Sequence, residues 1–82
     1  MATYYAKQVI SINAATGLGK TIQMPTTRTF RNEDDAVEQL LTWQRELERK
    51  GYRIDRQVGN TITMSKKDRE GNYHAKLEVT HS

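Results

Sequence analysis

The chain has 82 residues, of which 35% are hydrophobic, and a formal net charge of +3. This length excludes a second independent core, and no stretch approaches the roughly 18 consecutive apolar residues that a membrane-spanning helix needs. The absence of cysteine excludes disulfides, thiolate catalysis and cysteine zinc sites. The amino terminus also lacks a basic segment followed by an apolar run. We therefore expect a single soluble domain over residues 1–82, located in the cytoplasm.

Two strands are predicted in the first part of the chain. Residues Thr3 to Ile12 are rich in β-branched and aromatic types, which pack well on a pleated surface. Residues Lys20 to Phe30 carry four threonines and alternate in polarity, which predicts a second strand. Pro25 interrupts it and cannot donate a backbone hydrogen bond, so we expect this strand to lie at an edge of the sheet or to kink at Pro25.

One amphipathic helix is predicted over residues 33–50. Its apolar stripe recurs at spacings of four, three and four residues and consists of Ala36, Leu40, Trp43 and Leu47. Asn32 can cap the first turn, and the acidic residues that follow it suit the positive end of the helix dipole. Gly51 can supply the left-handed residue that ends a helix, and Tyr52 can fold back on the last turn.

Three short strands are predicted after the helix, at Tyr52–Val58, Ile62–Lys67 and Tyr73–His81. The element order is therefore ββαβββ, and the apolar positions together suffice for one core. We expect an α+β fold of two layers, in which an antiparallel sheet of about five strands carries the helix on one face.

The hydrophobic pattern also predicts the register of these strands. A two-residue loop at Gly59 and Asn60 would divide the apolar residues between the two faces, so we predict a three-residue loop that pairs Val58 with Ile62. The next hairpin pairs Met64 with Ala75. The predicted apolar face then holds Ile54, Val58, Ile62, Met64, Tyr73, Ala75, Leu77 and Val79. The predicted polar face holds Arg53, Asp55, Gln57, Thr63, Ser65, His74, Lys76, Glu78 and Thr80.

The string AATGLGKT, from Ala14 to Thr21, resembles a phosphate-binding loop. Such a loop grips phosphate only when a helix begins at the lysine and directs its amino-terminal dipole at the ligand. The following residues, TIQMPTTRTF, are β-branched and interrupted by proline, so they are poor at starting a helix. We predict a glycine-rich hairpin loop and no nucleotide binding.

The sequence offers no set of residues for catalysis or metal binding. His74 and His81 are the only histidines, and their odd separation places them on opposite faces of one strand. The run Glu33–Asp35 is explained by its position at a helix start. We therefore expect no enzymatic activity, no cofactor and no metal site.

Basic residues provide the candidate binding site. Lys66, Lys67 and Arg69 crowd one hairpin tip, Arg53 and Lys76 lie on the polar sheet face, and Tyr5 can stand among them. Such a surface can follow a phosphate backbone while an aromatic ring stacks on a base. The alternative is an ordinary solvated surface, because acids are interspersed at Asp55, Asp68, Glu70 and Glu78.

The run TFRNEDDAVEQLLTWQRELERKGY, followed by the hairpins at GNT and DREGN, resembles the layout of small phage and mobile-element proteins. Several anti-CRISPR proteins of this kind are a compact sheet with one helix and no active site. The resemblance is architectural and assigns no functional residue. It implies a phage-type inhibitor that blocks a host protein or nucleoprotein complex by occupying its surface.

Direct binding of DNA or RNA through the basic hairpin and the polar sheet face is the alternative function. A homodimer formed through an edge strand is a further arrangement to test, and no membrane partner is expected.

Overall fold

The structure is a computed structural model that describes residues 2–14, 21–69 and 71–82. These residues form five strands and one helix in the order ββαβββ, which confirms the predicted small α+β fold. The elements are β1 (Tyr4–Ala14), β2 (Thr21–Phe30), α1 (Glu33–Arg49), β3 (Arg53–Val58), β4 (Thr61–Asp68) and β5 (Gly71–His81).

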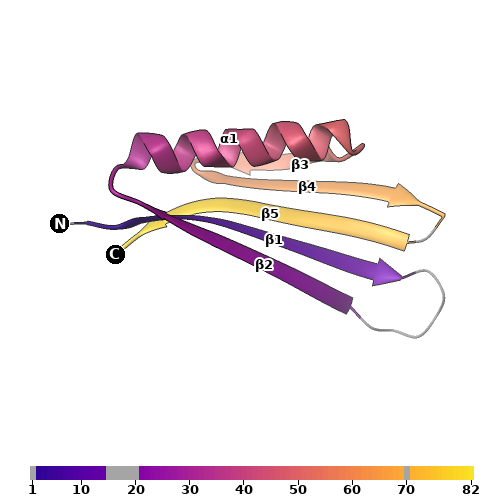
Figure 1. Cartoon of the computed structure of the whole chain (residues 1–82). Coiled ribbons are helices and arrows are strands. Elements are labelled where there is room, and N and C mark those ends of the chain that lie inside the picture. Colours follow the sequence, from indigo (N-terminus) through magenta and orange to yellow (C-terminus); the bar gives the residue numbers. More distant parts are fainter. Residues whose placement is uncertain (1, 15–20, 70) are drawn as a thin grey trace.

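The described strands make one antiparallel sheet with the order β2-β1-β5-β4-β3. Helix α1 lies on one face of this sheet, and none of the described elements covers the opposite face (Figure 1). Strand β2, which contains Pro25, lies at an edge as predicted. The two ends of the chain run side by side, and the Ser82 N–H donates to the Thr3 carbonyl over 3.1 Å.

Helix α1 begins and ends at the residues that the sequence predicts. The Asn32 side chain accepts a hydrogen bond of 2.9 Å from the backbone N–H of Asp35, so it satisfies one of the donors that a helix start leaves unpaired. After the last turn, Gly51 adopts a φ of +98°, and the Tyr52 N–H donates to the Leu47 carbonyl over 3.0 Å. This reversal is the glycine-terminated helix end that the sequence predicts.

The core lies between α1 and the sheet. The helix contributes the predicted apolar stripe, and the sheet contributes the side chains that alternation directs toward it. The buried apolar residues are Ala6, Ala36, Leu40, Trp43, Leu47, Tyr52, Ile62, Met64, Ala75 and Leu77. Trp43 and Met64 are therefore core residues, as their positions in the pattern predict.

The predicted register of the first hairpin after the helix is wrong. Val58 pairs with Thr61 and Gln57 pairs with Ile62, so the connection is the two-residue turn Gly59-Asn60. Gly59 has a φ of +56°, and such turns win because their twist matches that of the flanking strands. Val58 therefore lies on the face away from α1, and Gln57 lies on the helix side.

A β-bulge reconciles this turn with the hydrophobic pattern. The register shifts between Ile54 and Arg56, and the extra residue is Asp55. Ile54 thereby returns to the side of Met64, its partner, although its side chain remains 42% exposed on the edge strand. The next hairpin has the predicted register, with Met64 paired to Ala75.

Candidate nucleic-acid interface

We call the sheet face opposite α1 the open face. Pairing across the strands fixes which side chains share it, because directly opposed residues point to the same side. Its side chains include Tyr5, Lys7, Val9 and Ser11 of β1, His74, Lys76, Glu78 and Thr80 of β5, Thr61, Thr63, Ser65 and Lys67 of β4, and Arg53, Arg56 and Val58 of β3. Every one of them is partly or fully exposed.

The charge of the open face is strongly unbalanced. Among these residues five are basic and one, Glu78, is acidic. Glu78 contacts Lys76 at 3.8 Å, and the two side chains are 29% and 56% exposed, so water screens this pair. The basic members are Lys7, Arg53, Arg56, Lys67 and Lys76. Such a surface attracts a polyanion.

Among the residues just named, His74 and Tyr5 carry the rings of the open face, and Tyr5 has the larger one. Tyr5 pairs with Thr80 of β5 and Thr29 of β2, and its ring is half-buried. The Lys7 Nζ lies 5.9 Å from the centroid of this ring, which is within the range of a cation–π contact. A ring and a cation therefore stand side by side at one end of the face.

A shallow hollow of about 330 Å³ opens in the open face, beside the β3–β4 turn. It is lined by Arg56, Val58, Thr61 and Thr63. The guanidinium offers donors in a planar fork, the two threonines offer hydroxyls, and Val58, which is 57% exposed, offers an apolar wall. This combination suits a small planar group that carries polar edges.

The structure separates the six residues predicted as a binding site. Tyr5, Arg53, Lys67 and Lys76 share the open face. Arg69 is exposed between β4 and β5. Lys66 lies on the helix side, because it pairs with Tyr73 and alternates with Lys67.

Lys66 makes several contacts within the fold. Its Nζ lies 5.1 Å from the Tyr52 ring centroid and 4.8 Å from that of Tyr73. The same ammonium donates to the Lys50 carbonyl at the end of α1 over 3.3 Å. Two cation–π contacts and a favourable position at the negative end of the helix dipole therefore hold this side chain against the helix layer.

Strand pairing places one of the four acids predicted to mix with the basic residues, Glu78, on the open face, and one on the other side of the sheet. Asp68 lies on the helix side with Lys66, and its carboxylate accepts a hydrogen bond from the Gly71 N–H over 3.2 Å. Burial, helped by the negative charge of Asp68, raises the pKa of Tyr52 above 10.0. Asp55 occupies the bulge of β3, and Glu70 lies outside the described residues.

Helix α1, on the other face of the sheet, carries a net negative charge. Segment Glu33–Arg49 contains six acidic and two basic residues. The net charge of α1 is therefore opposite in sign to that of the open face, and an approaching polyanion is attracted to the open face and repelled by α1.

Sequence reasoning missed Lys7 and Arg56. Lys7 follows Tyr5 by two residues, so strand alternation places both on one face, and this signal was available. Arg56 has no such signal, because the bulge at Asp55 decides its face.

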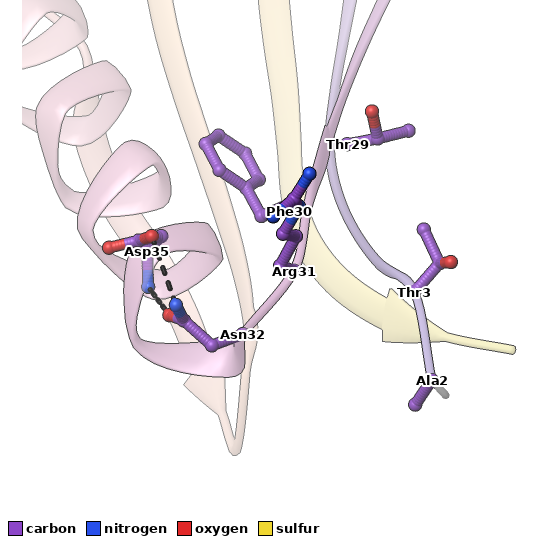
Figure 2. Close-up of a pocket in the computed structure, with 7 residues that line it drawn as sticks. All are labelled: Ala2, Thr3, Thr29, Phe30, Arg31, Asn32 and Asp35. Carbon is purple, nitrogen blue, oxygen red and sulfur yellow. Dashed lines mark hydrogen bonds between the residues drawn. The ribbon is translucent and has the colours of Figure 1, made fainter.

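A second hollow, of about 730 Å³, lies where the start of the chain passes the junction of β2 and α1. Figure 2 shows that Asn32 and Asp35, which line it, are hydrogen-bonded to each other. Its remaining lining residues are Ala2, Thr3, Thr29, Phe30 and Arg31. The polar groups of Asn32 and Asp35 are thus engaged in starting the helix.

Two sequence features resemble metal-binding or nucleotide-binding sites, namely the two histidines and the glycine-rich string. The strands around them do not have the arrangement that such sites need. His74 pairs with Ser11 on the open face, whereas His81 pairs with Tyr4 on the helix side, as predicted. The core of the glycine-rich string, residues 15–20, lies outside the described residues. Thr21, which follows it, begins strand β2 and pairs with Asn13, so it does not begin a helix. Within the described ranges, no group of three or more His, Cys, Asp or Glu side chains could hold a metal ion.

Comparison with protein-family models, with curated proteins and with solved structures finds no match to this chain. In the part of the chain that the structure describes, no helix is both long enough and apolar enough to cross a membrane.

Proposed function

We propose that this chain is a non-enzymatic binding protein whose open face binds nucleic acid directly. The observation that carries the proposal is the charge of that face, which holds five basic side chains and one acidic side chain among the residues that define it. The location that we propose is the cytoplasm. The basic residues are solvated, so contact with phosphates releases counterions and favours binding.

The spacing of the basic residues suits a chain of phosphates. On one strand, residues of the same face are separated by about 6.8 Å, and adjacent strands by about 4.8 Å. Lys7, Lys76 and Arg53 lie on successive rows of the sheet, on β1, β5 and β3. They therefore mark a path that crosses the face obliquely, and Lys67 continues it to the next row.

Fluorescence anisotropy with a labelled oligonucleotide at low salt tests this function. We expect Arg53→Glu to weaken binding by about tenfold or more, since it replaces an attractive charge with a repulsive one. Arg45→Glu, which makes the same charge change on exposed helix α1, is the matched control and should leave the affinity within about twofold.

Competition separates nucleic acid from other anions. We expect unlabelled oligonucleotide to displace the labelled one at far lower concentration than polyglutamate or vesicles of anionic lipid. Equal competition by polyglutamate would assign the open face to an acidic protein, and equal competition by vesicles would assign it to a membrane surface. Equal effects of the two arginine variants would also defeat the proposal.

The phage-type inhibitor is the second candidate function. The opposite charges of the open face and of α1 favour it, because a chain of this kind can contact both components of a nucleoprotein complex. Pull-down from a host lysate, with and without nuclease, tests this candidate. A protein partner that stays bound after nuclease treatment supports it, and the absence of such a partner counts against it.

A further inference from the structure

We infer that the open face takes an unpaired strand of nucleic acid, with one base stacked on Tyr5 and another seated in the hollow beside Arg56. This inference rests on the proposed function and names the class of nucleic acid. It is carried by two features of the face, one on β1 and the other beside the β3–β4 turn. Each feature suits a base better than a phosphate.

The first feature is the Tyr5 ring. It stands on the open face, next to Lys7, so a base that stacks on it has a cation within reach of the adjoining phosphate. Stacking on an aromatic side chain requires the flat face of a base to be exposed. In a duplex the base faces are covered by their neighbours, so only an unpaired or end base can use this ring.

The second feature is the hollow of about 330 Å³ beside the β3–β4 turn. Its apolar wall is Val58, which the two-residue turn brings to the open face. Arg56, Thr61 and Thr63 supply donors and acceptors around it. A base has this same division into an apolar ring and polar edges.

The distance between the two features suits a short stretch of one strand. Tyr5 lies on β1 and Val58 on β3, three strand positions away in the sheet, which corresponds to about 14 Å. Lys7 of β1 and Glu78 of β5 share the row of Thr61 and Val58, and Lys76 lies in the next row, with Thr63 and Arg56. Lys7 and Lys76 can therefore meet the linking phosphates from the two sides of Glu78. The nucleic-acid strand then crosses the open face from β1 to β3.

The shape of the open face also disfavours a duplex. Reading a major groove about 12 Å wide and 8.5 Å deep requires a helix or a two-stranded ribbon that enters it. The described part of this face consists of side chains of one sheet, many of them short hydroxyl residues. A sheet surface with the Tyr5 ring and one shallow hollow fits an extended strand better than a cylinder.

Anisotropy measurements on an oligonucleotide of about 16 nucleotides, alone and annealed to its complement, test the inference. We expect the single strand to bind at least about tenfold more tightly than the duplex. Tyr5→Leu should weaken single-strand binding by about 5- to 150-fold, the effect of losing one stacked base. Tyr5→Phe keeps the ring and should stay within about twofold of the native protein.

Val58→Asp tests the hollow independently, because it puts a carboxylate at the exposed position where the base is expected. It should weaken single-strand binding and leave the thermal unfolding midpoint nearly unchanged. As a measurement on the native protein, photocrosslinking of an oligonucleotide that carries a halogenated uracil should yield a Tyr5 adduct on mass mapping.

The outcomes distinguish the inference from the function on which it rests. Suppose that Arg53→Glu abolishes binding, that Tyr5→Leu binds the single strand as tightly as the native protein does, and that the duplex binds as tightly as the single strand. The open face is then a general polyanion surface and the inference is overturned. If neither form of the oligonucleotide binds at low salt, the proposed function itself fails. A crosslink confined to residues of α1 would overturn both.

Discussion

Val58 and Thr61 oppose each other directly across the β3–β4 turn, and both side chains therefore stand on the open face. A turn longer by one residue would have placed Val58 beside Ile62, against the helix. The turn therefore leaves the Val58 side chain 57% exposed, and this side chain forms the apolar wall of the hollow beside Arg56.

This register predicts the effect of shortening Val58. Val58→Ala should change the free energy of unfolding by no more than about 0.5 kcal/mol, because the side chain is exposed. Ile62→Ala, at a position only 1% exposed, should lower it by about 2–5 kcal/mol. Urea unfolding followed by circular dichroism measures both. A loss of 2 kcal/mol or more on Val58→Ala, on the scale of core truncations, would contradict the observed pairing.

Lys66 and Lys67 are neighbours in the chain with opposite expected roles. Lys66→Ala should lower the free energy of unfolding by about 1–2 kcal/mol, since it removes two cation–π contacts and the contact with the Lys50 carbonyl. Lys67→Ala should leave stability within about 0.5 kcal/mol and weaken oligonucleotide binding. Denaturant unfolding and anisotropy on both variants provide the comparison. The reverse assignment of the two effects would restore Lys66 as a binding residue.

The sequence predicts the elements of this fold because the signals for them are local. The Asn32 cap, the stripe that includes Trp43 and the glycine after the last turn each depend on residues within a few positions. The position of β2 at an edge follows from Pro25 in the same way.

The candidate site is less predictable, because it depends on register. Val58 and Gln57 exchange faces when a bulge, and not the loop length, adjusts the parity of the hairpin. The preference for alternation does not say which of the two devices a chain uses. Lys66 was predicted at a binding surface for a related reason: its neighbourhood in sequence is basic, whereas its neighbours in space are Tyr52 and Tyr73.

The Tyr52 hydroxyl predicts a dependence of stability on alkaline pH. In the folded state the pKa of Tyr52 is raised above its ordinary value of 10.0, mainly by burial and further by the negative charge of Asp68. As pH rises through the unfolded value, the unfolded chain loses this proton first, so the contribution to stability is present below pH 10 and declines above it.

Removing that hydroxyl isolates its effect from the titration of lysines. Tyr52→Phe keeps the aromatic ring beside Tyr73. Between about pH 9 and pH 11, the free energy of unfolding of the native protein should fall more steeply than that of Tyr52→Phe. Chemical denaturation across this range measures the two slopes. Parallel curves would show that the folded environment does not perturb this group.

The helix cap gives a test of how α1 is held. Asn32→Ala should lower the free energy of unfolding by about 1 kcal/mol, because the Asp35 N–H loses its acceptor. Asn32→Ser keeps a side-chain acceptor and sets no second carboxylate against Asp35, so it should restore most of the stability. Thermal unfolding of the three proteins checks the order. Equal stability of Asn32→Ala and the native protein would show that the Asn32 cap does not stabilise α1.

The salt dependence of single-strand binding measures directly whether the open face contacts the phosphates of nucleic acid. If the five basic side chains of the open face each meet a phosphate, the slope of log affinity against log salt should be about −3.5, and Arg53→Glu should make it shallower by at least about 0.7. Arg45→Glu on α1 should leave the slope unchanged. Equal slopes for the two variants, or no binding at low salt, would contradict the assignment of the open face as a nucleic-acid interface.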